Sequence, residues 1–147
     1  MPVQAVSCGL PYLYVPLATR RAVDSASLDG DAYERFLRAA HLQDLPVFLF
    51  SSETGGDKAT VYSRMFAPMF GIAEDPATGS ASGPLGCYLV RHKVVSPERA
   101  GSMLSLQGVK MGRSSQIHIA IGVTNGEIAD VRIGGQAVVA GEGNLYL

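Results

Sequence analysis

Residues Ala73–Val90, AEDPATGSASGPLGCYLV, carry the features from which the fold of the whole chain can be inferred. Two acidic residues run into Pro76, small residues follow, and the stretch ends in an apolar run at Tyr88–Val90. We predict a helix over about Thr78–His92 that is apolar on all sides and has little side-chain bulk at its start. Because such a helix has no polar face to present to water, it belongs inside the protein.

The segments around this helix have the period-two patterns and turn residues of β-strands. Two short strands broken at Gly9 and Pro11 are expected first, and then a buried strand and an alternating strand that stops at Pro68. A hairpin turn is expected at Asn125-Gly126, a pair that tolerates positive φ. The strand-like runs after the helix are 102–108, 116–123, 127–135 and 136–147.

A single surface helix is expected outside the strands. The segment 29–42, DGDAYERFLRAAHL, has apolar residues at helical spacing, and Asp29 or Asp31 is placed to cap it. The predicted fold class is therefore α+β, with an antiparallel β-barrel-like shell wrapped around the central apolar helix. The length of 147 residues fits one domain over residues 1–147.

Composition removes several classes of function. A net charge of −1 and the lack of tryptophan argue against a nucleic-acid partner. The apolar runs are too short to span a membrane, and no basic segment followed by an apolar one opens the chain, so a cytoplasmic location is expected. Cys8 and Cys87 have no metal-ligand spacing, and three scattered histidines do not suggest a metal site.

The start of the predicted helix has the chemistry of an anion site. If the helix begins at Thr78, the backbone N–H groups of Gly79, Ser80 and Ala81 lack partners within the helix and lie at its positive end. Asp75, held by the proline that follows it, lies just outside this end and is placed to accept or return a proton. No second acid or base is evident, although moving a proton across a carbon skeleton usually needs two positions.

The same residues have an ordinary structural interpretation. Asp and Thr before a helix are common caps, and Asp-Pro is a common turn. Glu74 is expected to be a solvated turn acid, and Arg64 either anchors the Asp75 turn by an ion pair or only decorates a strand edge. Cys87 is expected to be an inert core thiol, and His118 to face solvent or a neighbouring strand.

The segment Arg64–Val90, RMFAPMFGIAEDPATGSASGPLGCYLV, resembles the signature of the PhzF-like family of phenazine biosynthesis, whose fold is similar to that of diaminopimelate epimerase. Segments Val6–Leu17, Leu106–Gly122 and Val131–Leu147 also resemble that family, so the resemblance covers essentially the whole chain. It implies that the chain corresponds to the second, C-terminal domain of a fold whose two domains, each a barrel-like shell around a helix, face a common cleft.

The resemblance also implies roles for individual residues. Asp75 corresponds to the cleft aspartate that assists proton transfer, and Gly79 and Ser80, with Thr78 and Ala81 beside them, correspond to the site for the substrate carboxylate. The principal general base of the family is a glutamate of the first domain, which has no counterpart in this chain. No metal or organic cofactor is implied.

Three functions are compatible with these observations. The first is an isomerase or epimerase domain that acts on a small carboxylate and needs a separate first-domain chain or self-association into a homo-oligomer. The second is a non-catalytic domain that binds small carboxylates. The third is an inactive truncated fragment that only folds and associates.

Overall fold

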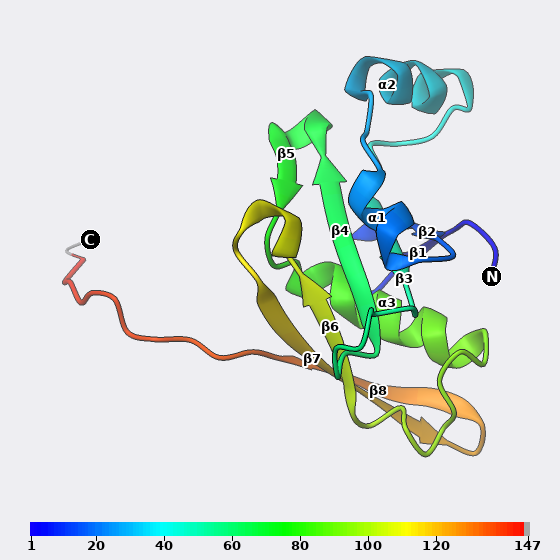
Figure 1. Ribbon diagram of the computed structural model, residues 1–147, viewed down its shortest axis with the longest axis vertical. Coiled ribbons are helices and arrows are strands. Elements are labelled where there is room, and N and C mark those ends of the chain that lie inside the picture. The colour runs from blue at the N-terminus through cyan, green and yellow to red at the C-terminus, as the bar shows by residue number, and fades with distance from the viewer. Residues whose placement is uncertain (146–147) are drawn as a thin grey trace.

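A mixed β-sheet curled into a half-barrel dominates the computed structural model, which describes residues 1–145 (Figure 1). The sheet has eight strands in the order β1-β2-β3-β4-β6-β7-β8, and β5 pairs with β4 outside this path. The strands are β1 (Gln4–Ser7), β2 (Pro11–Pro16), β3 (Val47–Ser51), β4 (Val61–Ala67), β5 (Ile72–Asp75), β6 (Met103–Gln107), β7 (Ser115–Thr124) and β8 (Glu127–Gly134). The helices are α1 (Arg20–Ser25), α2 (Gly30–Ala39) and α3 (Gly79–Arg91), with 3₁₀ turns η1 (Pro68–Phe70) and η2 (Val109–Met111).

The expectation of an antiparallel shell is corrected by two strand pairs. Strands β2 and β3 are parallel, and so are β4 and β6, whereas the other pairs of the sheet are antiparallel. Parallel neighbours need a crossover connection. Here α1 and α2 lie in the connection between β2 and β3, and α3 lies in the connection between β4 and β6. The sheet is therefore mixed and open.

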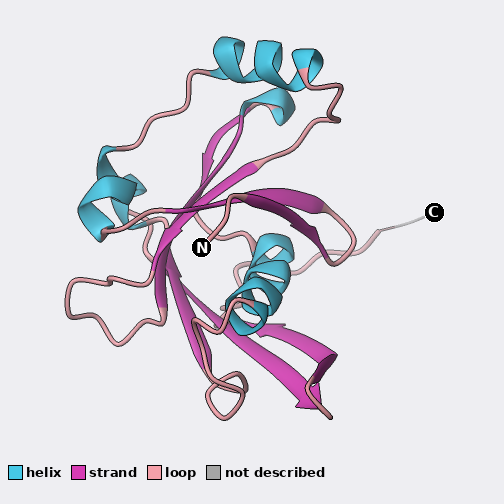
Figure 2. Ribbon diagram, turned by 90° about the vertical axis from the view of Figure 1, so that its right-hand side faces the viewer, coloured by secondary structure: helices cyan, strands magenta, loops and turns pink. Residues whose placement is uncertain are grey.

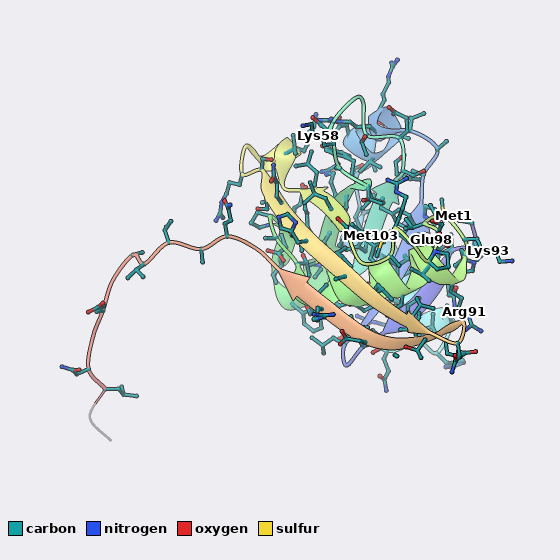
Figure 3. The ribbon with its side chains drawn as sticks, turned by 90° about the horizontal axis from the view of Figure 1, so that it is seen from below. Met1, Lys58, Arg91, Lys93, Glu98 and Met103 are labelled. Carbon is teal, nitrogen blue, oxygen red and sulfur yellow. The ribbon has the colours of Figure 1, made fainter. Side chains whose placement is uncertain are left out.

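The last of the predicted strands is not formed. Residues 136–145 have no secondary structure, and their apolar side chains are uncovered, with Val138 89% and Val139 85% exposed. Figures 1 and 3 show this segment running away from the half-barrel. A strand needs a neighbour for its backbone hydrogen bonds, and within residues 1–145 none lies beside this segment. Tyr146 and Leu147, which end the predicted run, lie outside the described residues.

The predicted apolar helix is present as α3, with Thr78 and His92 at its two caps. Figure 2 shows α3 on the concave side of the curled sheet, and it contacts β1, β2, β7 and β8. Its buried side chains, among them Leu85 and Leu89, join the larger of the two core clusters. The glycines of α3 let the sheet approach the helix closely. A Cβ on Gly86 would lie only 2.6 Å from Cγ2 of Ile119 on β7.

A second core cluster is built around α1 and α2. The predicted surface helix is α2, and Asp29 caps it by accepting a 2.9 Å hydrogen bond from the backbone N–H of Ala32. Tyr33 and Leu37 form its buried face. Helix α1 was not predicted, since its six residues RRAVDS are too short to show a helical period. Among the described residues, no helix combines the length and hydrophobicity that crossing a bilayer requires.

Substituting Gly86 by alanine tests the close approach between α3 and the sheet. The new methyl group would overlap Ile119 and Ile121, and we expect a loss of about 1–3 kcal/mol in the free energy of unfolding. The expected loss is net of the gain of about 1 kcal/mol that replacing a helical glycine by alanine ordinarily brings. Urea unfolding followed by circular dichroism measures the difference. Gly101→Ala is the matched control, because a Cβ there meets open space. A Gly86→Ala variant as stable as this control would contradict the packing described.

Candidate functional site

The predicted site residues come together where β5 ends and α3 begins. Asp75 is the last residue of β5, and Thr78 and Ser80 stand at the start of α3. All three line one cavity of about 300 Å³, whereas Gly79 and Ala81 are not among the lining residues that the structure describes. The rest of the wall is mainly apolar and includes Leu10, Pro11, Tyr12, Met65, Ala67, Phe70 and Ile72. The cavity therefore combines the carboxylates of Asp75 and the exposed Asp44, and the hydroxyls of Tyr12, Thr78 and Ser80, with an apolar surface.

Thr78 occupies the N-cap position without capping the helix. Its hydroxyl donates a 2.6 Å hydrogen bond to Oδ2 of Asp75, and within residues 1–145 it makes no capping hydrogen bond to α3. The side chain that ordinarily satisfies a first-turn N–H group is thus turned toward the carboxylate. Gly79 and Ser80 are exposed, while Ala81 is fully buried. The helix start accordingly keeps first-turn N–H groups that its own cap residue does not occupy.

Two tyrosines of β2 fix the position of the helix start. The hydroxyls of Tyr12 and Ser80 share a 2.7 Å hydrogen bond, and the hydroxyl of Tyr14 donates a 2.6 Å hydrogen bond to the carbonyl of Ala81. Burial is the main cause that raises the pKa of Tyr14, which keeps its phenol protonated as a donor. Sequence reasoning missed both tyrosines, although their spacing of two residues on a strand places them on one face.

Gln107 is a third site residue that sequence reasoning missed. It ends β6 and is fully buried, and within the described residues its side chain hydrogen-bonds only to the turn between Asp75 and Thr78. The adjacent Gly108 has φ 75°, and a Cβ there would lie 2.7 Å from the carbonyl oxygen of Pro76. An amide side chain at the end of an apolar strand, directly before a glycine, was the available signal.

Glu74 and Arg64 form a buried ion pair beside the site. Nε of Arg64 donates to Oε1 of Glu74 at 2.9 Å and Nη2 donates to Oε2 at 2.8 Å. The two side chains are 9% and 14% exposed, so the expectation that Glu74 is solvated is wrong. The hydrogen bond to Glu74 is the main cause that raises the pKa of Arg64. Of the two roles foreseen for Arg64, anchoring the turn by an ion pair is the one observed.

The cysteines and histidines lie outside the cavity. Cys87 packs against the larger core cluster, and burial, with Cys8 nearby, raises the pKa of its thiol to about 11. Cys8 and His118 are exposed, as predicted for His118. Within residues 1–145, no three or more His, Cys, Asp or Glu side chains gather as metal ligands.

Comparison with known proteins places this geometry in context. The family described as PhzC-PhzF, phenazine biosynthesis-like protein, matches residues 1–143. An uncharacterized isomerase of Clostridium acetobutylicum is 32% identical over 146 residues, which cover 99% of this chain and 48% of that protein. The trans-2,3-dihydro-3-hydroxyanthranilate isomerase of Pseudomonas chlororaphis is 30% identical over 146 residues, with coverages of 99% and 48%. The chain thus spans about half the length of the curated relatives it matches.

Solved structures share the fold. A phenazine biosynthesis protein of the PhzF family from Bacillus anthracis matches with a TM-score of 0.65 at 19% identity, over 86% of this chain and 43% of that one. A predicted epimerase from Pseudomonas aeruginosa matches with a TM-score of 0.61 at 27% identity, over 96% of this chain and 46% of that one. The first of these likenesses concerns the fold alone.

Removing one partner of the buried ion pair tests its structural role. We expect Glu74→Ala to lower the free energy of unfolding by about 3 kcal/mol, because it leaves the buried guanidinium of Arg64 without its carboxylate. The control is Glu34→Ala, which removes an exposed pair with Arg38 and should cost at most about 0.5 kcal/mol. Urea unfolding of both variants measures the difference, and equal losses would contradict a structural role for Glu74.

The raised pKa of Cys87 predicts slow alkylation. With a pKa of about 11, the thiol is almost fully protonated at pH 8, and the thiolate is the reactive form. Labelling by iodoacetamide, followed at the peptide level by mass spectrometry, should accelerate about tenfold for each pH unit between 8 and 10. The urea-unfolded chain is the control, and labelling of Cys87 at pH 8 as fast as in that control would contradict the prediction.

Proposed function

The chain belongs to the PhzC-PhzF family of phenazine biosynthesis-like proteins, and we propose that it forms one half of an isomerase or epimerase site that moves a proton on a small carboxylate. The observation that carries the proposal is the cavity that unites the Asp75 carboxylate with the uncapped start of α3. The isomerases among the relatives support the same reaction class.

Each part of the cavity has a role in this reaction. The carboxylate of the ligand binds at the start of α3, where backbone N–H groups of Gly79 and Ser80 and the positive end of the helix favour an anion. The Ser80 hydroxyl, held by Tyr12, adds a donor. The apolar wall receives the carbon skeleton, and Asp75 takes up or returns the proton. This chemistry uses only backbone and side-chain groups of the protein, and the proposal includes no metal or organic cofactor.

A second half is part of the proposal. Moving a proton between two positions needs a second acid or base, and the other carboxylate that lines the cavity, Asp44, is exposed in the loop before β3. We propose that residues 1–147 form one domain of a two-domain, diaminopimelate epimerase-like arrangement. A separate first-domain chain or a second copy then closes the cavity. Leu10 and Phe70, 61% and 59% exposed beside it, are the apolar surface that such a partner would cover.

The first test is ligand binding by the chain itself. Amide NMR shifts of Gly79, Ser80 and Ala81 are followed while small cyclic and amino-acid carboxylates are added, with trans-2,3-dihydro-3-hydroxyanthranilate among them. We expect saturable shifts confined to the start of α3. An amide analogue of each ligand, which lacks the negative charge, is the control. If these amide resonances do not shift at millimolar carboxylate, the proposed site is contradicted.

The second test is proton exchange. The chain is mixed in D₂O with the separately produced first half of the Pseudomonas chlororaphis relative, and deuterium entering the ligand is measured by mass spectrometry. We expect exchange that Asp75→Asn slows by about 10²–10⁴-fold, because the amide cannot carry the proton. Binding without deuterium uptake in this mixture would instead identify a non-catalytic carboxylate-binding domain.

A further inference from the structure

The side-chain amide of Gln107 is committed entirely to the turn that carries Asp75. Its Oε1 accepts a 3.2 Å hydrogen bond from the backbone N–H of Thr78, and its Nε2 donates at 2.8 Å to the carbonyl of Asp75. The first partner is only a donor and the second is only an acceptor, so the amide has one possible orientation. Gln107 is fully buried and is not among the described residues that line the cavity.

This orientation determines the direction of the hydrogen bond that reaches Asp75. The same Nε2 donates a second hydrogen bond, 2.8 Å long, to Oγ1 of Thr78. Because Oγ1 accepts from the amide, the hydroxyl proton of Thr78 is free to point at Oδ2 of Asp75, 2.6 Å away. The chain of donors therefore runs in one direction, from Gln107 through Thr78 to the carboxylate.

We propose that Gln107 and Thr78 are positioning residues that hold the Asp75 side chain in one rotamer and give its two oxygens different tasks. Oδ2 receives the Thr78 hydroxyl, and Oδ1, which accepts no hydrogen bond from the protein within residues 1–145, exchanges the proton with the ligand. The catalytic part of this inference rests on the proposed function. The part that concerns the rotamer depends only on the geometry of the turn.

Three substitutions separate positioning from a general structural role. Thr78→Val keeps the shape of the side chain and removes the hydroxyl, whereas Thr78→Ser keeps the hydroxyl and is the conservative control. Gln107→Glu keeps an acceptor for the Thr78 N–H group but has no N–H to donate, so the hydroxyl of Thr78 gains a competing acceptor and turns away from Asp75.

The first readout is the rotamer of Asp75, obtained from its Hα–Hβ scalar couplings. We expect one rotamer in the unaltered chain and in Thr78→Ser, and averaged couplings in Thr78→Val and Gln107→Glu. Because this measurement needs no catalysis, it decides the inference even if no variant exchanges deuterium, a result that would count against the proposed function alone. A single unchanged rotamer in Thr78→Val would overturn the inference.

The second readout is kinetic and uses the mixture with the first half of the relative in D₂O. We expect kcat for exchange to fall about 10- to 100-fold in Thr78→Val and Gln107→Glu, with KM within about threefold, because a misplaced carboxylate loses alignment but not ligand binding. Thr78→Ser should restore kcat. Exchange at the unaltered rate in Thr78→Val would overturn the inference. If Gln107→Glu does not fold, as judged by circular dichroism, the Thr78 pair alone decides.

Discussion

The bare surface of α3 at Gly83 and Gly86 lets β7 and β8 lie directly against the helix backbone. A Cβ on Gly86 would overlap Ile119 and Ile121, and one on Gly83 would come within 3.1 Å of Cγ1 of Val131. With these contacts the helix has little freedom to shift or rotate inside the half-barrel. The position of its first turn, beside the end of β5 and the tyrosines of β2, follows from that constraint.

The neighbouring carboxylates of Glu74 and Asp75 contact different parts of the protein because β5 is pleated. Successive side chains of a strand point to opposite faces, so Glu74 and Asp75 are turned in opposite directions. Glu74 meets the guanidinium of Arg64 on the side of α1, and Arg64 also donates to the carbonyls of Val23 and Ala26. Asp75 meets Thr78 and the cavity. The ion pair thus fastens the strand that presents the second carboxylate.

The features that were predicted correctly are those that local sequence determines. The apolar character of α3, the cap of α2 and the turn at Asn125-Gly126, where both residues have positive φ, are set by residues close together in the chain. The two parallel strand pairs and the missing final strand depend on which distant segments become neighbours. Short elements such as α1 give no period to detect. Whether such short elements form depends on the segments that pack around them.

The candidate site also has one part that local sequence predicts and another that depends on distant segments. Asp75, Thr78 and Ser80 belong to one continuous stretch, and their gathering was foreseen from its turn and helix start. Gln107 lies 29 residues from Thr78, and its role appears only when β6 is placed beside the turn. The burial of Glu74 was misjudged for the same reason, since it depends on the pairing of β5 with β4, the strand that carries Arg64.

An anchored carboxylate has a consequence for stereochemistry. In the proposed reaction, an Asp75 side chain held by Thr78 would approach a bound carbon skeleton from a single direction, so a proton that it delivers would arrive on one face of the molecule. Placement of the second acid or base then decides the product. On the opposite face of the same carbon, it would invert a stereocentre. A second acid or base on the same face, but beside another carbon, would shift a hydrogen along that face of the molecule and move a double bond.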